Sequence, residues 1–193
     1  LECFESTLAT KSGRELMYGS IDTYSYILAS VAPANLTSYT TPAETESLGA
    51  MSMYNLDNLT EIILTDDIRN IDEQALYDCD GITEIVVPNQ VRYIREGAFR
   101  DCDNLEKVVL GSSLLGISEL AFANCKSLTT IELRATTPPN INNSTFENLD
   151  KEAIRVIVPS SAIQVYKDSD WSRFNLVAEG TDLSSANVIR YTT

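Results

Sequence analysis

Apolar residues in the middle of the chain recur in short runs, and each run follows a short polar segment. The runs read Leu-x-x-Ile-x-Leu at 59–64, Ile-x-x-Ile-x-Val at 82–87, Leu-x-x-Val-x-Leu at 105–110 and Leu-x-x-Ile-x-Leu at 128–133. Side chains alternate between the two faces of a strand, and valine and isoleucine favour strands. Each run therefore predicts a short strand with one inward face. Between the runs, Ala75, Leu76 and Cys79 are spaced as on the inward face of one short helical turn.

The pattern repeats every 23 residues, as the spacing of Cys79, Cys102 and Cys125 shows. A fixed period of this length indicates stacked repeats. One coil cannot bury its own apolar side, whereas stacked coils bury it and pair their strands in parallel. We therefore predict a β-rich α/β fold: a right-handed solenoid with a parallel sheet on one face, turns or single helical turns on the other, and irregular end coils. The predicted core is Leu59, Ile62, Leu64, Ile71, Leu76, Ile82, Ile85, Val87, Ile94, Phe99, Leu105, Val108, Leu110, Ile117, Phe122, Leu128, Ile131 and Leu133.

One string of the repeat is specific enough to suggest a family. Val-Pro-x-x-Val-x-x-Ile at 87–94, followed by Glu-Gly-Ala-Phe-x-x-Cys-x-x-Leu at 96–105, resembles the BspA-like leucine-rich repeats of bacterial surface proteins. It departs from the common leucine-rich consensus, which has an asparagine or cysteine after the strand. The resemblance implies a leucine-rich-repeat solenoid outside the cell or on its surface. It also implies adhesion to host or bacterial proteins, or to surface matrix.

The period breaks towards both ends of the chain, which predicts the domain boundaries. Residues 1–34 are expected to form an irregular hairpin cap, with Gly13-x-x-Leu16-x-Tyr18 similar to the hairpin-bearing coil of this family. Residues 35–159 are expected to form repeats of 23–25 residues, 160–183 a C-terminal cap, and 184–193 a tail or linker to a further module. The abrupt start at Leu1 fits a trimmed piece of something longer.

The charge and hydrophobicity of the chain disfavour some classes of binding partner. The 193 residues include 14 basic and 28 acidic side chains, for a net charge of −14. This balance disfavours nucleic acid and anionic membranes, both of which attract basic surfaces, and we attribute it to solubility rather than to cation binding. No apolar run approaches the roughly 20 residues of a membrane-spanning helix, so we expect no membrane insertion.

The sequence lacks the residues and motifs that common enzyme mechanisms require. Histidine is absent, which removes the commonest general base and zinc ligand. The chain also lacks a Ser-His-Asp set and the glycine-rich phosphate-binding motifs. We therefore predict a non-enzymatic protein without a cofactor.

The cysteine column has two interpretations. Stacked cysteines with Cα atoms about 5 Å apart could form a disulfide, whereas buried cysteine also serves as a small apolar residue. Leu56 and Leu149 occupy the equivalent positions in other coils, so we favour core residues. Cys3 stands alone. It could be a lipid-modified N-terminal cysteine of a precursor, but the lack of a preceding apolar run argues against this interpretation.

An acidic column also has two interpretations. Asp57, Asp80 and Asp103 align, and a calcium ion would relieve their repulsion. Asx side chains also form turns by bonding their own backbone. Lys126 interrupts the column, and the flanking positions are Asx residues in every coil. We therefore favour turns.

The outward positions of the predicted strands form the candidate binding surface. Ile63, Val86 and Val109 align as an apolar stripe, and such stripes mark binding sites when they are exposed. Strand preference, or a loop covering the stripe, would explain the same residues. The predicted partner-binding residues are Glu61, Ile63, Glu84, Val86, Lys107 and Val109.

These observations predict a monomeric protein-interaction or adhesion module of a bacterial cell-surface or secreted protein. Its partner would be a protein or a surface-matrix ligand, including one from a host. The alternative is a structural spacer or accessory domain of a longer surface protein, with no ligand of its own.

Overall fold

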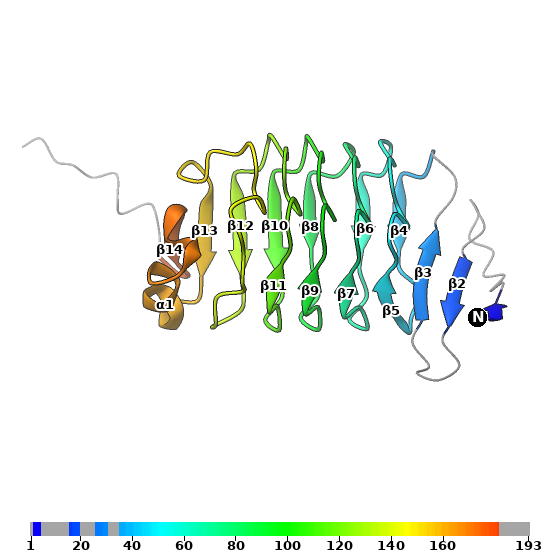
Figure 1. Cartoon of the computed structure of the whole chain (residues 1–193), viewed down its shortest axis with the longest axis horizontal. Helices are drawn as coiled ribbons and strands as arrows, with labels where there is room; N and C mark the ends of the chain where they lie inside the picture. Colours follow the sequence, from blue (N-terminus) through cyan, green and yellow to red (C-terminus); the bar gives the residue numbers. More distant parts are fainter. Residues whose placement is uncertain (1, 5–15, 20–25, 31–34, 182–193) are drawn as a thin grey trace, which may run out of the picture.

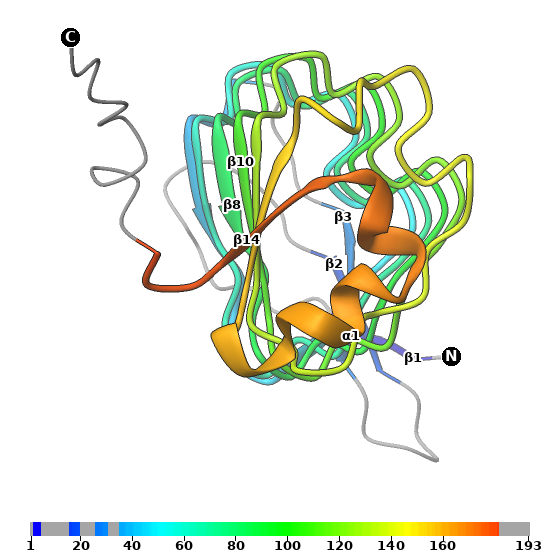
Figure 2. The same cartoon turned by 90° about the vertical axis from the view of Figure 1, so that its left-hand side faces the viewer.

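The fold is a solenoid of coils stacked along one axis. The computed structural model describes residues 2–4, 16–19, 26–30 and 35–181. Figure 1 shows the coils side by side, and Figure 2 looks along the stack, where they overlay as nested rings. Because each coil repeats the same apolar positions, every inward column continues from one coil to the next.

The predicted parallel sheet is confirmed along one face. A five-stranded sheet has the order β14-β13-β12-β10-β8, and β4 and β6 form a two-stranded parallel sheet in the neighbouring coils. The strands of this face are β4 (Ser38–Thr40), β6 (Glu61–Ile63), β8 (Glu84–Val86), β10 (Lys107–Leu110), β12 (Thr130–Leu133), β13 (Arg155–Val158) and β14 (Asn175–Ala178). Lys107 pairs with Glu84 on one side and with Thr130 on the other, so the register follows the period of the sequence.

A second sheet runs along another face, and the sequence analysis did not anticipate it. Its order is β1-β2-β3-β5-β7-β9-β11. The strands are β1 (Glu2–Phe4), β2 (Leu16–Gly19), β3 (Tyr26–Ser30), β5 (Thr45–Leu48), β7 (Asn70–Ile71), β9 (Tyr93–Ile94) and β11 (Gly116–Ile117). The sheet is parallel from β3 onward, whereas β2 pairs antiparallel with β1 and with β3. Two residues per coil suffice for a strand here, because the stacked neighbours already hold the register.

The short helical turn expected around 73–79 does not form. The segment consists of turns, and alternate N–H groups donate to the next coil: Gln74 to Glu96 at 2.9 Å, Leu76 to Ala98 at 2.8 Å. The φ angle of Gln74 is +54°, which interrupts any helical path. Hydrogen bonds between coils thus replace the bonds that a helix would make within itself. The helical elements described are near the C-terminal end: α1 (Ile163–Lys167) and the 3-10 turns Ser160–Ala162 and Asp170–Arg173.

The core is one continuous column, and every predicted core residue is buried in it. Phe99, Phe122 and Phe146 stack face to face from coil to coil, with centroids 5.1 and 5.4 Å apart. Trp171 then meets the ring of Phe146 edge-on at 5.8 Å and closes the column.

Three aromatic residues cover the C-terminal end of the core. Trp171, Tyr166 and Phe174 are buried. The Tyr166 hydroxyl donates to the Ala135 carbonyl, and the Trp171 indole N–H donates to that of Pro139, both at 2.9 Å. The domain boundaries stay a prediction. Gly13 and the tail at 184–193 lie outside the described residues.

Candidate interaction surface

The apolar stripe is exposed at two of its three positions. Ile63 at the end of β6 is 51% exposed and Val86 at the end of β8 is 46% exposed. Alternation turns Ile62 and Ile85 into the core, which leaves these two side chains on the outer face. The solvent thus reaches two adjacent β-branched side chains on a rigid sheet.

The third position differs from the prediction. Val109 aligns with Val86 but is only 3% exposed, so the expectation that it faces solvent is wrong. Val109 lies on β10, which has a neighbouring strand on each side, and it is paired with Val86 of β8 and with Glu132 of β12. Arg134 follows β12, yet it lines a hollow with Val86 of β8, so its side chain extends across β10.

Gly111 lies beside Arg134, in the preceding coil. It follows β10 at the position equivalent to Arg134, since Leu110 pairs with Leu133. A Cβ atom at Gly111 would lie 2.2 Å from the carbonyl oxygen of Pro88, so a side chain does not fit here. The atoms that it would meet belong to the backbone of Pro88 and Asn89, so glycine is needed because the two coils approach closely here.

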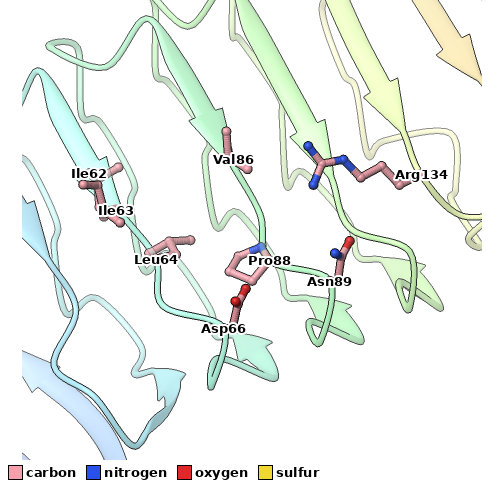
Figure 3. Close-up of a pocket in the computed structure, with 8 residues that line it drawn as sticks. All are labelled: Ile62, Ile63, Leu64, Asp66, Val86, Pro88, Asn89 and Arg134. Carbon is pink, nitrogen blue, oxygen red and sulfur yellow. The ribbon is translucent and has the colours of Figure 1, made fainter. Parts of the chain in front are cut away.

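The exposed stripe opens into a hollow of about 280 Å³ on the same face. Figure 3 shows Arg134 extending toward Val86, with Asn89 below it and Asp66 at the opposite side near Pro88. The lining residues are Ile62, Ile63, Leu64, Asp66, Val86, Pro88, Asn89 and Arg134. An apolar floor with charged and amide groups at its rim has the general composition of a recognition site.

Two of the charged residues predicted beside the stripe pair with each other, and a second ion pair lies near them. Lys107 Nζ lies 2.7 Å from Glu84 Oε1, whereas Arg134 Nε lies 3.8 Å from Glu132 Oε1. Glu61 is exposed at the start of β6. Exposed ion pairs contribute little to stability, so these side chains are available for a partner. The structure thus brings five predicted site residues to one surface and adds Arg134, Asn89 and Asp66, which the sequence analysis missed.

The asparagine and aspartate residues that flank the acidic column lie in turns. The residues at one repeated position have left-handed φ angles between 55° and 63°, and all are asparagine or aspartate: Asn55, Asp78, Asp101, Asn124 and Asn148. These two residue types tolerate that conformation better than most. Within the described ranges, no group of three or more acidic, cysteine or histidine side chains is arranged to hold a metal ion.

Hydrogen bonds along this column shift the pKa of its carboxylates. Burial raises the pKa of Asp101, but hydrogen bonds from Asn124 and Tyr77, together with the Arg100 and Lys126 charges, leave it lowered. Burial raises the pKa of Asp78, and the neighbouring aspartates raise it further. Lys126 Nζ lies 2.6 Å from Asp103 Oδ2.

The cysteine column is part of the core, as predicted. Cys79, Cys102 and Cys125 are buried free thiols. Each donates to the carbonyl of a preceding coil: Met53 at 2.9 Å, Leu76 at 3.1 Å and Phe99 at 3.1 Å. Burial raises the pKa of Cys79 and of Cys125 to about 12. These thiols therefore stay protonated and unreactive at neutral pH.

Comparison with known proteins identifies the repeat type. A model of the BspA type leucine rich repeat region matches residues 28–153 in six copies. No curated protein matches the chain. In the part of the chain that the structure describes, no helix is long and apolar enough to cross a membrane.

Three solved structures share the fold. A leucine rich cell surface protein of Faecalibacterium prausnitzii is 20% identical, with a TM-score of 0.50 over 68% of this chain and 39% of its own. The T. pallidum leucine rich repeat protein is 20% identical, with a TM-score of 0.53 over 67% of this chain and 72% of its own. The pneumococcal vaccine antigen PcpA is 21% identical, with a TM-score of 0.55 over 79% of this chain and 44% of its own. This chain thus spans less than half the length of the first and the third.

Proposed function

Since the chain belongs to the BspA-type leucine-rich repeat family, we propose that it is a non-enzymatic interaction module of a bacterial cell-surface or secreted protein. Stacked repeats form rigid, extended surfaces that generally serve protein recognition. The module binds a host protein or a surface-matrix ligand as a monomer, and its role is adhesion. One structural neighbour is a leucine rich cell surface protein, which agrees with this location.

The exposed pair Ile63 and Val86 is the observation that carries the proposal. Both side chains project from backbone that is held by stacked coils, so binding orders few groups and loses little entropy. An aliphatic patch with a charged rim is also the usual anatomy of a protein interface. We place the binding surface at Glu61, Ile63, Glu84, Val86 and Lys107, with Arg134 in place of the buried Val109.

The test is binding to an array of immobilised host matrix proteins, bacterial surface proteins and glycans. The full chain is compared with the double variant Ile63→Thr and Val86→Thr, which keeps β-branched residues and removes apolar surface. Leu115→Thr with Val165→Thr is the matched control, because each of these side chains is 50% exposed elsewhere on the molecule. We expect the first variant to lose the bound ligand and the control to keep it.

Absence of binding to every member of the array would contradict adhesion and support the spacer alternative. Equal loss in both variants would place the binding surface elsewhere. Sedimentation of the unbound chain tests the monomer, and a concentration-dependent dimer would contradict it.

A further inference from the structure

We propose that the hollow beside Arg134 recognises an acidic peptide segment of the partner. An aliphatic side chain of an extended segment rests on Ile63 and Val86, and the carboxylate of the next residue pairs with Arg134. This proposal rests on the proposed function and specifies the chemistry of the partner.

The floor of the hollow suits an aliphatic side chain. Ile63 and Val86 are about half exposed, and the buried Pro88 lines the hollow beside them. Burial of apolar surface stabilises a complex by about 25 cal/mol per Å². The volume of about 280 Å³ is sufficient for one side chain and part of its backbone, rather than for a large cofactor.

Arg134 supplies the charge that selects a carboxylate. In the described part of the chain its guanidinium has one ion pair, at the long distance of 3.8 Å from Nε to Glu132 Oε1. The terminal nitrogens, which Figure 3 shows toward Val86, remain for a partner. A guanidinium binds a carboxylate through two parallel hydrogen bonds, which gives direction as well as affinity.

Asn89 and Asp66 make the two sides of the hollow electrostatically different. The amide oxygen of Asn89 accepts a hydrogen bond from the Ser112 N–H at 3.1 Å, so its amide nitrogen remains as a second donor near Arg134. The exposed carboxylate of Asp66 lies at the opposite side of the hollow (Figure 3) and repels an acidic group there. A bound segment is therefore expected to place its carboxylate near Arg134 and Asn89.

The test is titration of the full chain, with labelled isoleucine and valine methyl groups, by three short capped peptides. The first carries Leu-Glu at its centre, the second Leu-Gln and the third Ser-Glu. We expect the Leu-Glu peptide to shift the Ile63 and Val86 methyl signals and to bind about threefold more tightly than the Leu-Gln peptide, the scale of an exposed ion pair. The Ser-Glu peptide should bind more weakly than the Leu-Glu peptide.

Arg134→Gln should remove the preference for glutamate, and Arg134→Lys should retain part of it. Equal binding of the Leu-Glu and Leu-Gln peptides to the unmodified chain would overturn the proposal, as would shifts away from Ile63 and Val86. A matrix protein whose binding needs Ile63 and Val86 but not Arg134 would leave the proposed function standing and refute the acidic partner. The two proposals can therefore fail separately.

Discussion

The ring of Phe122 lies between those of Phe99 and Phe146, parallel to the Phe99 ring within 4° and 5.1 Å from it. Offset rings at this distance attract each other beyond the area that they bury. The three rings come from successive coils, so this column joins the central coils to the C-terminal cap. Phe122 therefore contributes to the packing between the central coils and the C-terminal cap.

Phe122→Ala should lower the free energy of unfolding by about 3–5 kcal/mol, because it leaves a cavity in a fully packed column. Urea unfolding followed by circular dichroism measures the change. In a repeat array, loss of one coil can also uncouple the two halves, so a second unfolding step is expected. Exposed Leu115→Ala is the control and should change the stability by less than about 0.5 kcal/mol.

Val109→Lys should be far more damaging than Val86→Lys, although both valines have aligned outward positions in the sheet. Val109 is 3% exposed, and a buried ammonium group without a partner costs several kcal/mol. Val86 is 46% exposed, so its replacement should cost about 0.5 kcal/mol or less. Thermal unfolding of the two variants distinguishes them. Similar melting temperatures would contradict the burial of Val109.

Gly97 and Gln74 are stacked residues with left-handed φ angles of 61° and 54°. Gly97→Ala should destabilise the fold by about 1 kcal/mol, because a Cβ atom is unfavourable in this conformation. Gln74→Gly should stabilise it by about 0.5 kcal/mol, since the relief exceeds the entropy that glycine adds to the unfolded chain. Gly116→Ala is the matched control: the nearest atoms to its added Cβ are 3.7 Å away, and it should be close to neutral. Chemical unfolding of all three variants measures these differences.

Asp78→Asn should stabilise the chain at neutral pH. Burial and the surrounding aspartates raise the pKa of Asp78, so its ionised form opposes folding. That penalty is absent below the unfolded pKa and develops as the pH rises towards and through the raised folded value. The gain of Asp78→Asn should therefore shrink in acid. Asparagine also retains the tolerance for the left-handed conformation. Melting temperatures at pH 7 and pH 3 test this, and a gain at pH 3 as large as that at pH 7 would refute it.

Asp101→Asn should act in the opposite direction. Despite the effect of burial, hydrogen bonds from Asn124 and Tyr77 and nearby cations lower the pKa of Asp101. Its ionised form therefore stabilises the fold above the unfolded pKa, and this contribution is lost as the pH falls through the folded value. The variant should melt below the unmodified chain at pH 7 and approach it in acid. A higher melting temperature at pH 7 would contradict this assignment.

Much of the fold could be predicted because the signal was repeated. The same local pattern surrounds Ile62, Ile85 and Val108, and the 23-residue spacing aligns them. The inward face and the parallel register of the strands could therefore be predicted together. The second sheet was harder to predict, because Asn70–Ile71 and Tyr93–Ile94 are too short to alternate visibly. They are strands only because neighbouring coils are beside them.

The candidate site was predicted only in part, for a related reason. Ile63 and Val86 face outward by alternation, and the structure agrees. Val109 also faces outward by alternation, yet it is only 3% exposed, and Arg134 reaches the hollow beside Val86 from across β10. Such properties depend on side chains of adjacent coils, and no local pattern encodes them.

The sequence by itself determined the stack, the parallel strands and the buried column, since a repeated apolar pattern admits one arrangement that buries it. Only the tertiary structure decided which outward residues meet solvent, where the hollow lies and how the turns are formed. Those properties depend on side chains and backbone groups of adjacent coils, which the chain brings together only after it has folded.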